Sequence, residues 1–299
     1  MSNILNQVIK GKIKRPKIIT IFGVDGVGKS SFAAQSPNPI FLGAEEGTSN
    51  LDVSRLPQPK NWKDVIASIE ALEKEKHDYK TFVVDSLDWL EPILHREICQ
   101  EYGVNSIEKA AGGYGKGYTE AVNKWDTFVK GCSALRDKGM NIILIAHAEV
   151  IKFSDPMTQS EYDRYQLKLY KKTAALIREF CDAVLFANYE LFTKKDGTRT
   201  RAFGDGVRVM HTERRPGFDA KNRYGLKPTL SLDWNEFEKA CESGNPNDPT
   251  IIKNQIVELV KEVQDEQKRT LIMETVEKAG NDAVKLDQIK NRIMVILNA

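Results

Sequence analysis

The sequence is poor in cysteine, and its cysteines are not arranged as in small proteins that disulfide bonds stabilise. Its four cysteines, Cys99, Cys132, Cys181 and Cys241, are far apart and form no Cys-x-x-Cys pair. This spacing argues against a disulfide-dense scaffold and against a structural zinc site. We expect reduced, mostly buried thiols in a cytosolic protein.

Long hydrophobic runs and an excess of one charge are missing as well. No apolar run approaches the roughly 20 residues of a membrane-spanning helix. The lysine-bearing N-terminal segment lacks the apolar stretch and cleavage site of a secretory signal. The 299 residues carry 44 Lys and Arg against 42 Asp and Glu, which excludes a uniformly basic coat but not a local basic patch. A hydrophobic content of 41% excludes disorder as the main state and allows one sizeable core with a small appendage.

Short apolar runs alternate with helical patterns in the first half of the chain. The runs at 18–22, 39–42, 81–85 and 141–147 have the length and composition of buried strands. Amphipathic patterns predict helices at about 62–76, 88–102 and 119–138. Strands that alternate with helices favour an α/β fold with a mostly parallel sheet that is covered on both faces.

The second half of the chain has a different pattern. β-rich runs at 183–193 and 198–203 flank Lys194-Lys195-Asp196-Gly197, which predicts a hairpin, and a short strand at 207–212 adds to an antiparallel edge. The Gly- and Pro-containing stretch 244–249 is typical of a linker. We therefore expect a core domain at 1–244 and, at 245–299, a linker with two helices broken near 280–282. These helices look too small to hold a core alone, so we expect them to pack on the core, on a second copy or on a partner.

The clearest motif is a phosphate-binding loop. The segment Gly23-Val24-Asp25-Gly26-Val27-Gly28-Lys29-Ser30 fits GxxxxGK[ST] between a predicted strand and a predicted helix. Its glycines let backbone N–H groups point at phosphate oxygens, Lys29 can reach the outer phosphates, and the Ser30 hydroxyl can bind Mg²⁺. We expect these residues and Ser31 to bind the nucleotide. Asp85, at the end of a later buried strand, is a candidate partner of the Mg²⁺ ion.

Two other classes of phosphate-binding protein are disfavoured. Asn123-Lys124-Trp125-Asp126 has the base-reading pattern of a GTPase, but it lies inside a predicted helix and no apolar strand precedes it. We interpret it as a chance match on the solvated face of a helix. A small-molecule kinase would need a mobile Arg-rich lid between helices, whereas the Arg-rich segment of this chain falls on predicted β structure.

Over roughly residues 16–235 the pattern resembles the RecA-like ATPase core, and within it the phage-encoded recombination ATPases. The P-loop lies near the N-terminus, and Asp85 occupies the Walker B position. The other shared features are Glu45 and Glu46 after the second strand, His147 at the end of the fourth strand, and the basic pair Lys221 and Arg223. The P-loop is specific for the superfamily, whereas the order and spacing of the other features carry the narrower resemblance.

The resemblance implies a role for each of these residues. Glu45 would polarise the attacking water, with Glu46 as the competing choice, and the alternative is that one or both only cap a loop. His147 would sense the γ-phosphate, although many RecA-like proteins have Gln there, and the alternative is an ordinary hydrogen-bonded histidine. Lys221 and Arg223 would reach the ATP of a neighbouring subunit, or else belong to a basic surface strand.

The resemblance also implies two loops for single-stranded DNA. The first is Gly112–Tyr118, where Tyr114, Lys116 and Tyr118 suit stacked bases and a phosphate backbone. The second runs from 147 to about 173, and we expect a long functional loop there. Its candidate DNA contacts are Lys152, Arg164, Lys168, Lys171 and Lys172. The stretch 194–227 has ten Lys and Arg against four Asp and Glu, and is either a phosphate-binding face or a solvated hairpin.

These features together predict an ATPase that uses ATP and Mg²⁺, is stimulated by single-stranded DNA, and promotes annealing or strand exchange. ATP would lie between the subunits of a ring or filament. The alternatives are a RecA-like helicase or translocase, and a nucleotide-switched adaptor or loader. We expect a cytoplasmic, phage-encoded protein in a bacterial host, without membrane contact. Its C-terminal helices would bind a single-strand-binding protein or another replication or recombination protein.

Overall fold

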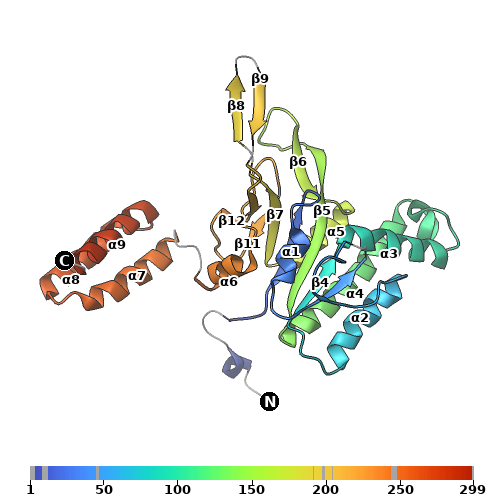
Figure 1. The fold of residues 1–299 in the computed structure, drawn as a ribbon, viewed down its shortest axis with the longest axis horizontal. Coiled ribbons are helices and arrows are strands. Elements are labelled where there is room, and N and C mark those ends of the chain that lie inside the picture. The colour runs from blue at the N-terminus through green and yellow to red at the C-terminus, as the bar shows by residue number, and fades with distance from the viewer. Residues whose placement is uncertain are drawn as a thin grey trace. The chain divides into compact units, whose positions relative to one another are not determined.

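The structure is a computed structural model that describes residues 4–8, 13–44, 47–190, 192–196, 199–203, 205–243 and 248–297. It divides into two compact units, each assembled from separate stretches of the sequence. Unit 1 comprises Met1–Ile21, Ser36–His147 and Leu167–Cys181, and unit 2 comprises Phe22–Gln35, Ala148–Gln166 and Asp182–Ala299. The strands β1 (Ile18–Gly23) and β5 (Asn141–Phe153) each belong partly to both units. Figure 1 shows the helices and strands of the described chain.

The described chain is a mixed α/β fold. Its other strands are β2 (Pro39–Gly43), β3 (Ser54–Arg55), β4 (Thr81–Asp85), β6 (Tyr162–Leu167), β7 (Ala183–Tyr189), β8 (Phe192–Asp196), β9 (Arg199–Phe203), β10 (Arg208–His211), β11 (Lys221–Asn222) and β12 (Thr229–Ser231). Its helices are α1 (Lys29–Ala34), α2 (Trp62–Lys74), α3 (Leu87–Glu101), α4 (Lys116–Asp137), α5 (Lys171–Phe180), α6 (Trp234–Ser243), α7 (Pro249–Glu262), α8 (Glu266–Ala279) and α9 (Ala283–Leu297), with short 3₁₀ turns η1 (Ile4–Gln7) and η2 (Ile107–Gly112). The strand order of the main sheet is β12-β10-β7-β1-β5-β4-β2-β3, with β6 on β5 and β11 on β7. This confirms the predicted fold class.

Unit 1 contains the parallel part of the sheet. β2 pairs with β4 and β4 with β5, so that Phe41, Val83 and Ile143 lie side by side in register. Every residue of β4 is buried, which explains why its sequence is a continuous apolar run instead of an alternating one. The predicted strands and the three predicted helices of this half are confirmed, with ends shifted by a few residues.

The helices of unit 1 pack on an aromatic core. The ring of Trp62, at the start of α2, meets the ring of Trp125 edge-on with centroids 4.8 Å apart. Trp125 belongs to the segment Asn123–Asp126 inside α4 and is fully buried. Lys124 forms an ion pair with Glu101 at 2.6 Å. The GTPase-like tetrapeptide therefore lies inside a helix, as predicted, but the expectation that it forms a solvated face is wrong for Trp125, because this ring packs in the aromatic core.

Unit 2 contains the antiparallel edge. β10 pairs antiparallel with β7 and with β12, and β8 pairs with β9 as the predicted hairpin. The predicted strand 183–193 is wrong as one element, because β7 ends at Tyr189 and β8 begins at Phe192. Tyr189 pairs with Arg208, the first residue of β10, and the register of the β7–β10 ladder ends there.

The long loop expected after His147 is also wrong. β5 continues to Phe153, β6 covers Tyr162–Leu167, and α5 begins at Lys171. Within β5 the last residues alternate between half-buried and exposed positions, which is the pattern of a strand with one solvated face. The low apolar content of this segment reflects that solvated face.

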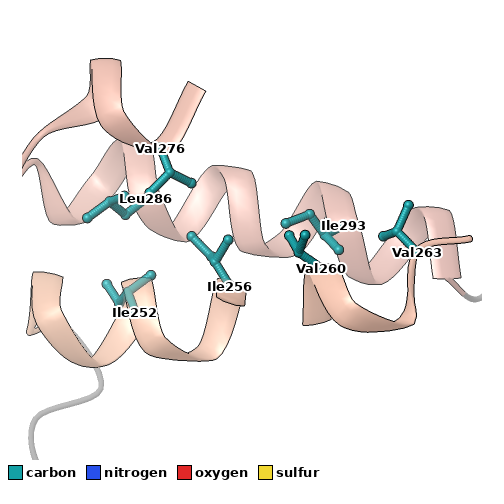
Figure 2. Close-up of a cluster of buried hydrophobic side chains, with 7 residues drawn as sticks. All are labelled: Ile252, Ile256, Val260, Val263, Val276, Leu286 and Ile293. Carbon is teal, nitrogen blue, oxygen red and sulfur yellow. The ribbon is translucent and has the colours of Figure 1, made fainter. Parts of the chain in front are cut away.

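The C-terminal segment forms a small helical core of its own (Figure 2). Its buried side chains are Ile252, Ile256, Val260, Val263, Val276, Leu286 and Ile293. The expectations of two helices and of no separate core are both wrong. The chain breaks between α7 and α8 because Asp265 caps α8, accepting hydrogen bonds from the N–H groups of Gln267 and Lys268. Most of the predicted linker, residues 244–247, lies outside the described residues.

None of the described helices combines the length and the apolar character needed to cross a membrane.

Candidate nucleotide and DNA sites

The P-loop connects β1 to α1 and packs closely against β7. A Cβ atom on Gly23 would lie 1.9 Å from the carbonyl oxygen of Ala187, so only glycine fits at this position. Gly26 and Gly28 have φ angles of 71° and 106°, which side chains rarely tolerate. The loop therefore needs its glycines for one close packing contact and for two left-handed turns.

The interior of the loop is suited to an anion. Lys29 is only 6% exposed, and its Nζ donates hydrogen bonds to the carbonyl oxygens of Gly23 at 3.0 Å and Val24 at 2.9 Å. The backbone N–H groups of Gly26, Val27 and Gly28 have no hydrogen-bond acceptor within the described part of the chain. A cation beside several available N–H donors is the arrangement that binds phosphate oxygens. The residues present therefore fit a nucleotide phosphate.

Other residues of unit 2 contact the loop and the helix α1 that follows it. The Tyr189 hydroxyl donates a hydrogen bond to the carbonyl oxygen of Gly26 at 3.2 Å. At the far end of α1, the Gln35 side chain accepts a hydrogen bond from the N–H of Trp234 at 2.9 Å. Phe32 packs against Trp234 with ring centroids 5.6 Å apart. These contacts fix both ends of the loop and its helix.

In unit 1, Asp85 lies at the carboxyl end of β4. Asp85 is only 3% exposed, and its backbone carbonyl oxygen accepts a hydrogen bond from the N–H of Ala44 at 2.8 Å. Ala44 immediately precedes Glu45 and Glu46, which lie outside the described residues. The predicted catalytic carboxylate therefore stays a prediction, whereas Asp85 is a buried strand-end carboxylate as expected.

His147 is held by Asp88, a residue that the sequence analysis did not single out. One Asp88 oxygen accepts the backbone N–H of His147 at 3.0 Å, and the other lies 2.9 Å from Nδ1 of the imidazole. Burial alone would raise the pKa of Asp88, but the hydrogen bonds from the His147 ring and backbone outweigh it and lower that pKa. Asp88 stands in the first turn of α3, three residues after Asp85, and this spacing was the available sequence signal.

The basic residues Lys221 and Arg223 do not lie together on one strand. β11 covers only Lys221–Asn222, so Arg223 follows the strand instead of sharing its face with Lys221. An Arg223 Nη1 lies 3.4 Å from a carboxylate oxygen of Asp182 in the same chain. The side chain of Arg223 is 57% exposed, so this ion pair is weak and open to competition. Its predicted role toward a neighbouring subunit stays a prediction.

Within unit 1, the structure places the first predicted DNA segment against the last residues of the second. The ring of Tyr118, from the first segment, stacks on the ring of Tyr170, from the second, with centroids 4.3 Å apart and planes 14° apart. Ahead of Tyr118, five successive residues, 111–115, have positive φ angles. Tyr114, in the middle of this run, is fully exposed.

The predicted DNA-binding cations divide into three groups. Lys116, Lys168, Lys171 and Lys172 are exposed in unit 1. Lys152 is exposed but forms an ion pair with Asp163 at 2.7 Å. The prediction for Arg164 is wrong, because this residue is 5% exposed, lies over the Phe153 ring at 4.5 Å and is ion-paired with Asp219 at 3.1 Å. A guanidinium held in this way stabilises the interior of unit 2 and does not face solvent.

A Gly-rich loop of this geometry on an α/β sheet defines the class as a P-loop NTPase. A family model described as an AAA domain matches residues 15–224, which is most of the chain. The chain therefore belongs to this AAA-domain family and is a P-loop ATPase.

Similarity to individual proteins is more distant. The SPbeta prophage-derived uncharacterized protein YorG of Bacillus subtilis (strain 168) is 28% identical over 136 residues, which is 44% of this chain and 41% of that protein. The matched part thus spans less than half of that relative's length. The flagellar accessory protein FlaH from Methanocaldococcus jannaschii is 14% identical, with a TM-score of 0.38 over 77% of this chain and 90% of its own. The KaiC-like protein PH0186 from Pyrococcus horikoshii OT3 is also 14% identical, with a TM-score of 0.32 over 67% and 80%. Likenesses at these TM-scores carry no conclusion.

Proposed function

We propose that this P-loop ATPase assembles on single-stranded DNA and promotes annealing or strand exchange, with ATP bound at subunit interfaces. The observation that carries the proposal is the stacking of Tyr118 on Tyr170. It joins a glycine-rich segment that bears an exposed tyrosine and lysine to a second segment with three exposed lysines. Aromatic faces beside flexible cations suit the bases and backbone of a single strand.

The nucleotide chemistry follows from the P-loop. Lys29 and the loop N–H groups would hold the phosphates, and the Ser30 hydroxyl would bind Mg²⁺ with Asp85 as its carboxylate partner. The Mg²⁺ ion, when bound, neutralises charge that develops on the transferred phosphoryl group. Glu45, or Glu46 in its place, would orient the attacking water. Lys221 and Arg223 would act on the ATP of a neighbouring subunit.

Coupling between nucleotide and DNA would run through α3 and the segment after His147. Asp88 and Glu91 are neighbours on one face of α3. Asp88 holds His147, and a Glu91 carboxylate oxygen accepts the backbone N–H of Tyr170 at 2.9 Å. The carbonyl oxygen of His147 accepts the N–H of Lys168 at 3.0 Å. A shift of His147 on nucleotide binding would therefore be transmitted to both Lys168 and Tyr170.

The likeness to a prophage-derived protein is consistent with a phage origin and a cytoplasmic site of action in the bacterial host. Recombination of phage DNA would supply the single strands that the protein binds. The C-terminal helices would contact a single-strand-binding protein or another replication or recombination protein.

The double substitution Tyr114→Ala with Lys116→Ala tests the DNA site. Both side chains are exposed, so the fold should be retained. Loss of one stacking platform and one phosphate contact predicts at least about a tenfold weaker affinity for single-stranded DNA, with a shallower salt dependence. Fluorescence anisotropy with a labelled oligonucleotide measures both quantities. Lys130→Ala, an exposed lysine on the same helix as Lys116, is the control, and unchanged affinity of the double variant would refute the assignment.

An adaptor or loader is the second candidate, because the C-terminal segment has its own hydrophobic core together with exposed apolar side chains such as Leu271, Val284 and Val295. ATP hydrolysis that ignores DNA would favour it. Strand displacement on a forked duplex would instead favour a helicase or translocase.

A further inference from the structure

Arg208 is a charged side chain beside the P-loop that the nucleotide motif does not include. It is the first residue of β10 and is exposed. A Cβ atom on Gly28 would lie 3.0 Å from Nη1 of Arg208 and 3.8 Å from its Cδ. The guanidinium thus lies directly against the glycine that precedes Lys29.

The position of Arg208 is fixed by its strand. Its backbone pairs with Tyr189 across the β7–β10 ladder, and its carbonyl oxygen accepts a hydrogen bond from the N–H of Leu232 at 3.4 Å. Tyr189, its partner in the ladder, is the residue whose hydroxyl holds the Gly26 carbonyl oxygen. The same pair of strands therefore fixes the loop and presents the guanidinium to it.

Within the part of the chain that the structure describes, no carboxylate pairs with the guanidinium of Arg208. Lys29 and Arg208 thus place two cationic side chains at one loop. A planar guanidinium with several donors binds phosphate oxygens in a bidentate manner, so a phosphate group at this loop would give Arg208 an anionic partner.

We infer that Arg208 binds a phosphate group of the nucleotide held by the P-loop of its own subunit. The basic stretch 194–227 therefore contains at least one residue that serves the nucleotide and not the DNA. The inference rests on the nucleotide-binding part of the proposed function. It adds a cis cation to the trans cations Lys221 and Arg223.

Isothermal titration calorimetry without DNA tests this inference, with ATP and inorganic tripolyphosphate as the two probes. Arg208→Met keeps the length of the side chain and removes its charge. We expect the affinity for both probes to fall by about tenfold or more, because charged hydrogen bonds to phosphate are lost. Arg208→Lys should recover part of the affinity, since it restores the charge without the planar fork. Arg215→Ala, an exposed arginine of the same basic stretch, should change neither affinity.

Three results would overturn the inference. If Arg208→Met leaves both affinities unchanged while Lys29→Ala abolishes them, the nucleotide site is correct and Arg208 is not part of it. If Arg208→Met weakens ATP but not tripolyphosphate, its contact is with the base or sugar. If Lys29→Ala also has no effect on either probe, the P-loop assignment fails, and the proposed function fails with it.

Discussion

Substituting Asp88 with alanine removes the carboxylate that holds His147 at the end of the buried part of β5. The structure shows two hydrogen bonds between this carboxylate and His147, one to the backbone N–H and one to the ring. Asp88 has a side chain that is 3% exposed, so water cannot easily replace the lost acceptor. Both donors of His147 would then be left without their partner.

The expected cost follows from those two bonds. A buried donor left unsatisfied costs about 1–3 kcal/mol. The His147 side chain is 20% exposed, so water recovers part of the ring contribution. We therefore expect Asp88→Ala to lower the free energy of unfolding by about 2–4 kcal/mol. Asp88→Asn should cost about half as much, because its amide oxygen still accepts one hydrogen bond.

Urea denaturation followed by circular dichroism measures this difference. Asp126→Asn is the matched control, since it removes the charge of an exposed ion pair with Lys130 and should change stability by less than about 0.5 kcal/mol. A loss for Asp88→Ala no greater than that of the control would refute the reasoning. DNA-stimulated ATP hydrolysis should fall in Asp88→Ala, because in the proposed mechanism His147 would couple the nucleotide to Lys168.

The pH dependence of stability gives an independent measure of the same contact. The pKa of Asp88 is lowered from its ordinary value of 3.8, so the ionised carboxylate stabilises the fold at pH values above 3.8. That contribution is lost as the pH falls through the lowered native pKa. The stability difference between the wild type and Asp88→Asn should therefore be full near neutral pH and shrink below pH 3.8. A difference that does not change with acid would contradict the assignment.

Three further predictions concern packing. Gly117→Ala should destabilise the protein by about 1–3 kcal/mol and weaken DNA binding, because the added Cβ atom would lie 2.0 Å from the Ile107 carbonyl oxygen. Thermal unfolding measures the loss, and Gly217→Ala is the neutral control because its added Cβ atom would meet nothing within 4 Å. Ile256→Ala, at a fully buried position of the C-terminal core, should cost about 2–5 kcal/mol in the stability of that core and speed amide hydrogen exchange there, whereas the partly exposed Val257→Ala should not. Buried Cys132 and Cys181 should react slowly with a thiol reagent, since burial raises the pKa of Cys132, while Cys99 and Cys241 should react first.

Much of the fold and the phosphate site could be predicted from local sequence. The strands at 18–23, 81–85 and 141–147 are buried on both faces, and continuous apolar runs report that directly. The P-loop could be predicted for the same reason, because its glycines, its lysine and its serine hydroxyl all lie within the continuous segment Gly23–Ser30. Its backbone angles then follow from the glycine positions.

The rest depends on contacts between distant residues. Counting charges could not separate Arg164 from the exposed lysines, since its partner Asp219 comes from another strand connection far along the chain. The hydrogen bond between His147 and Asp88 likewise joins residues that are 59 positions apart in the sequence. In the tail, one apolar stripe predicted a single long helix, and the cap at Asp265 divides it into α7 and α8. Periodicity shows which face is apolar, whereas a side-chain cap decides where the helix begins.

The most direct test of the central claim is the rate of ATP hydrolysis by the purified protein, measured with and without single-stranded DNA beside the Lys29→Ala variant. We expect hydrolysis that single-stranded DNA stimulates strongly and that Lys29→Ala abolishes, because Lys29 would bind the phosphates of the nucleotide. Hydrolysis at the same rate with and without DNA would contradict the recombination function and favour a nucleotide-switched adaptor. Hydrolysis that survives Lys29→Ala would contradict the nucleotide site itself.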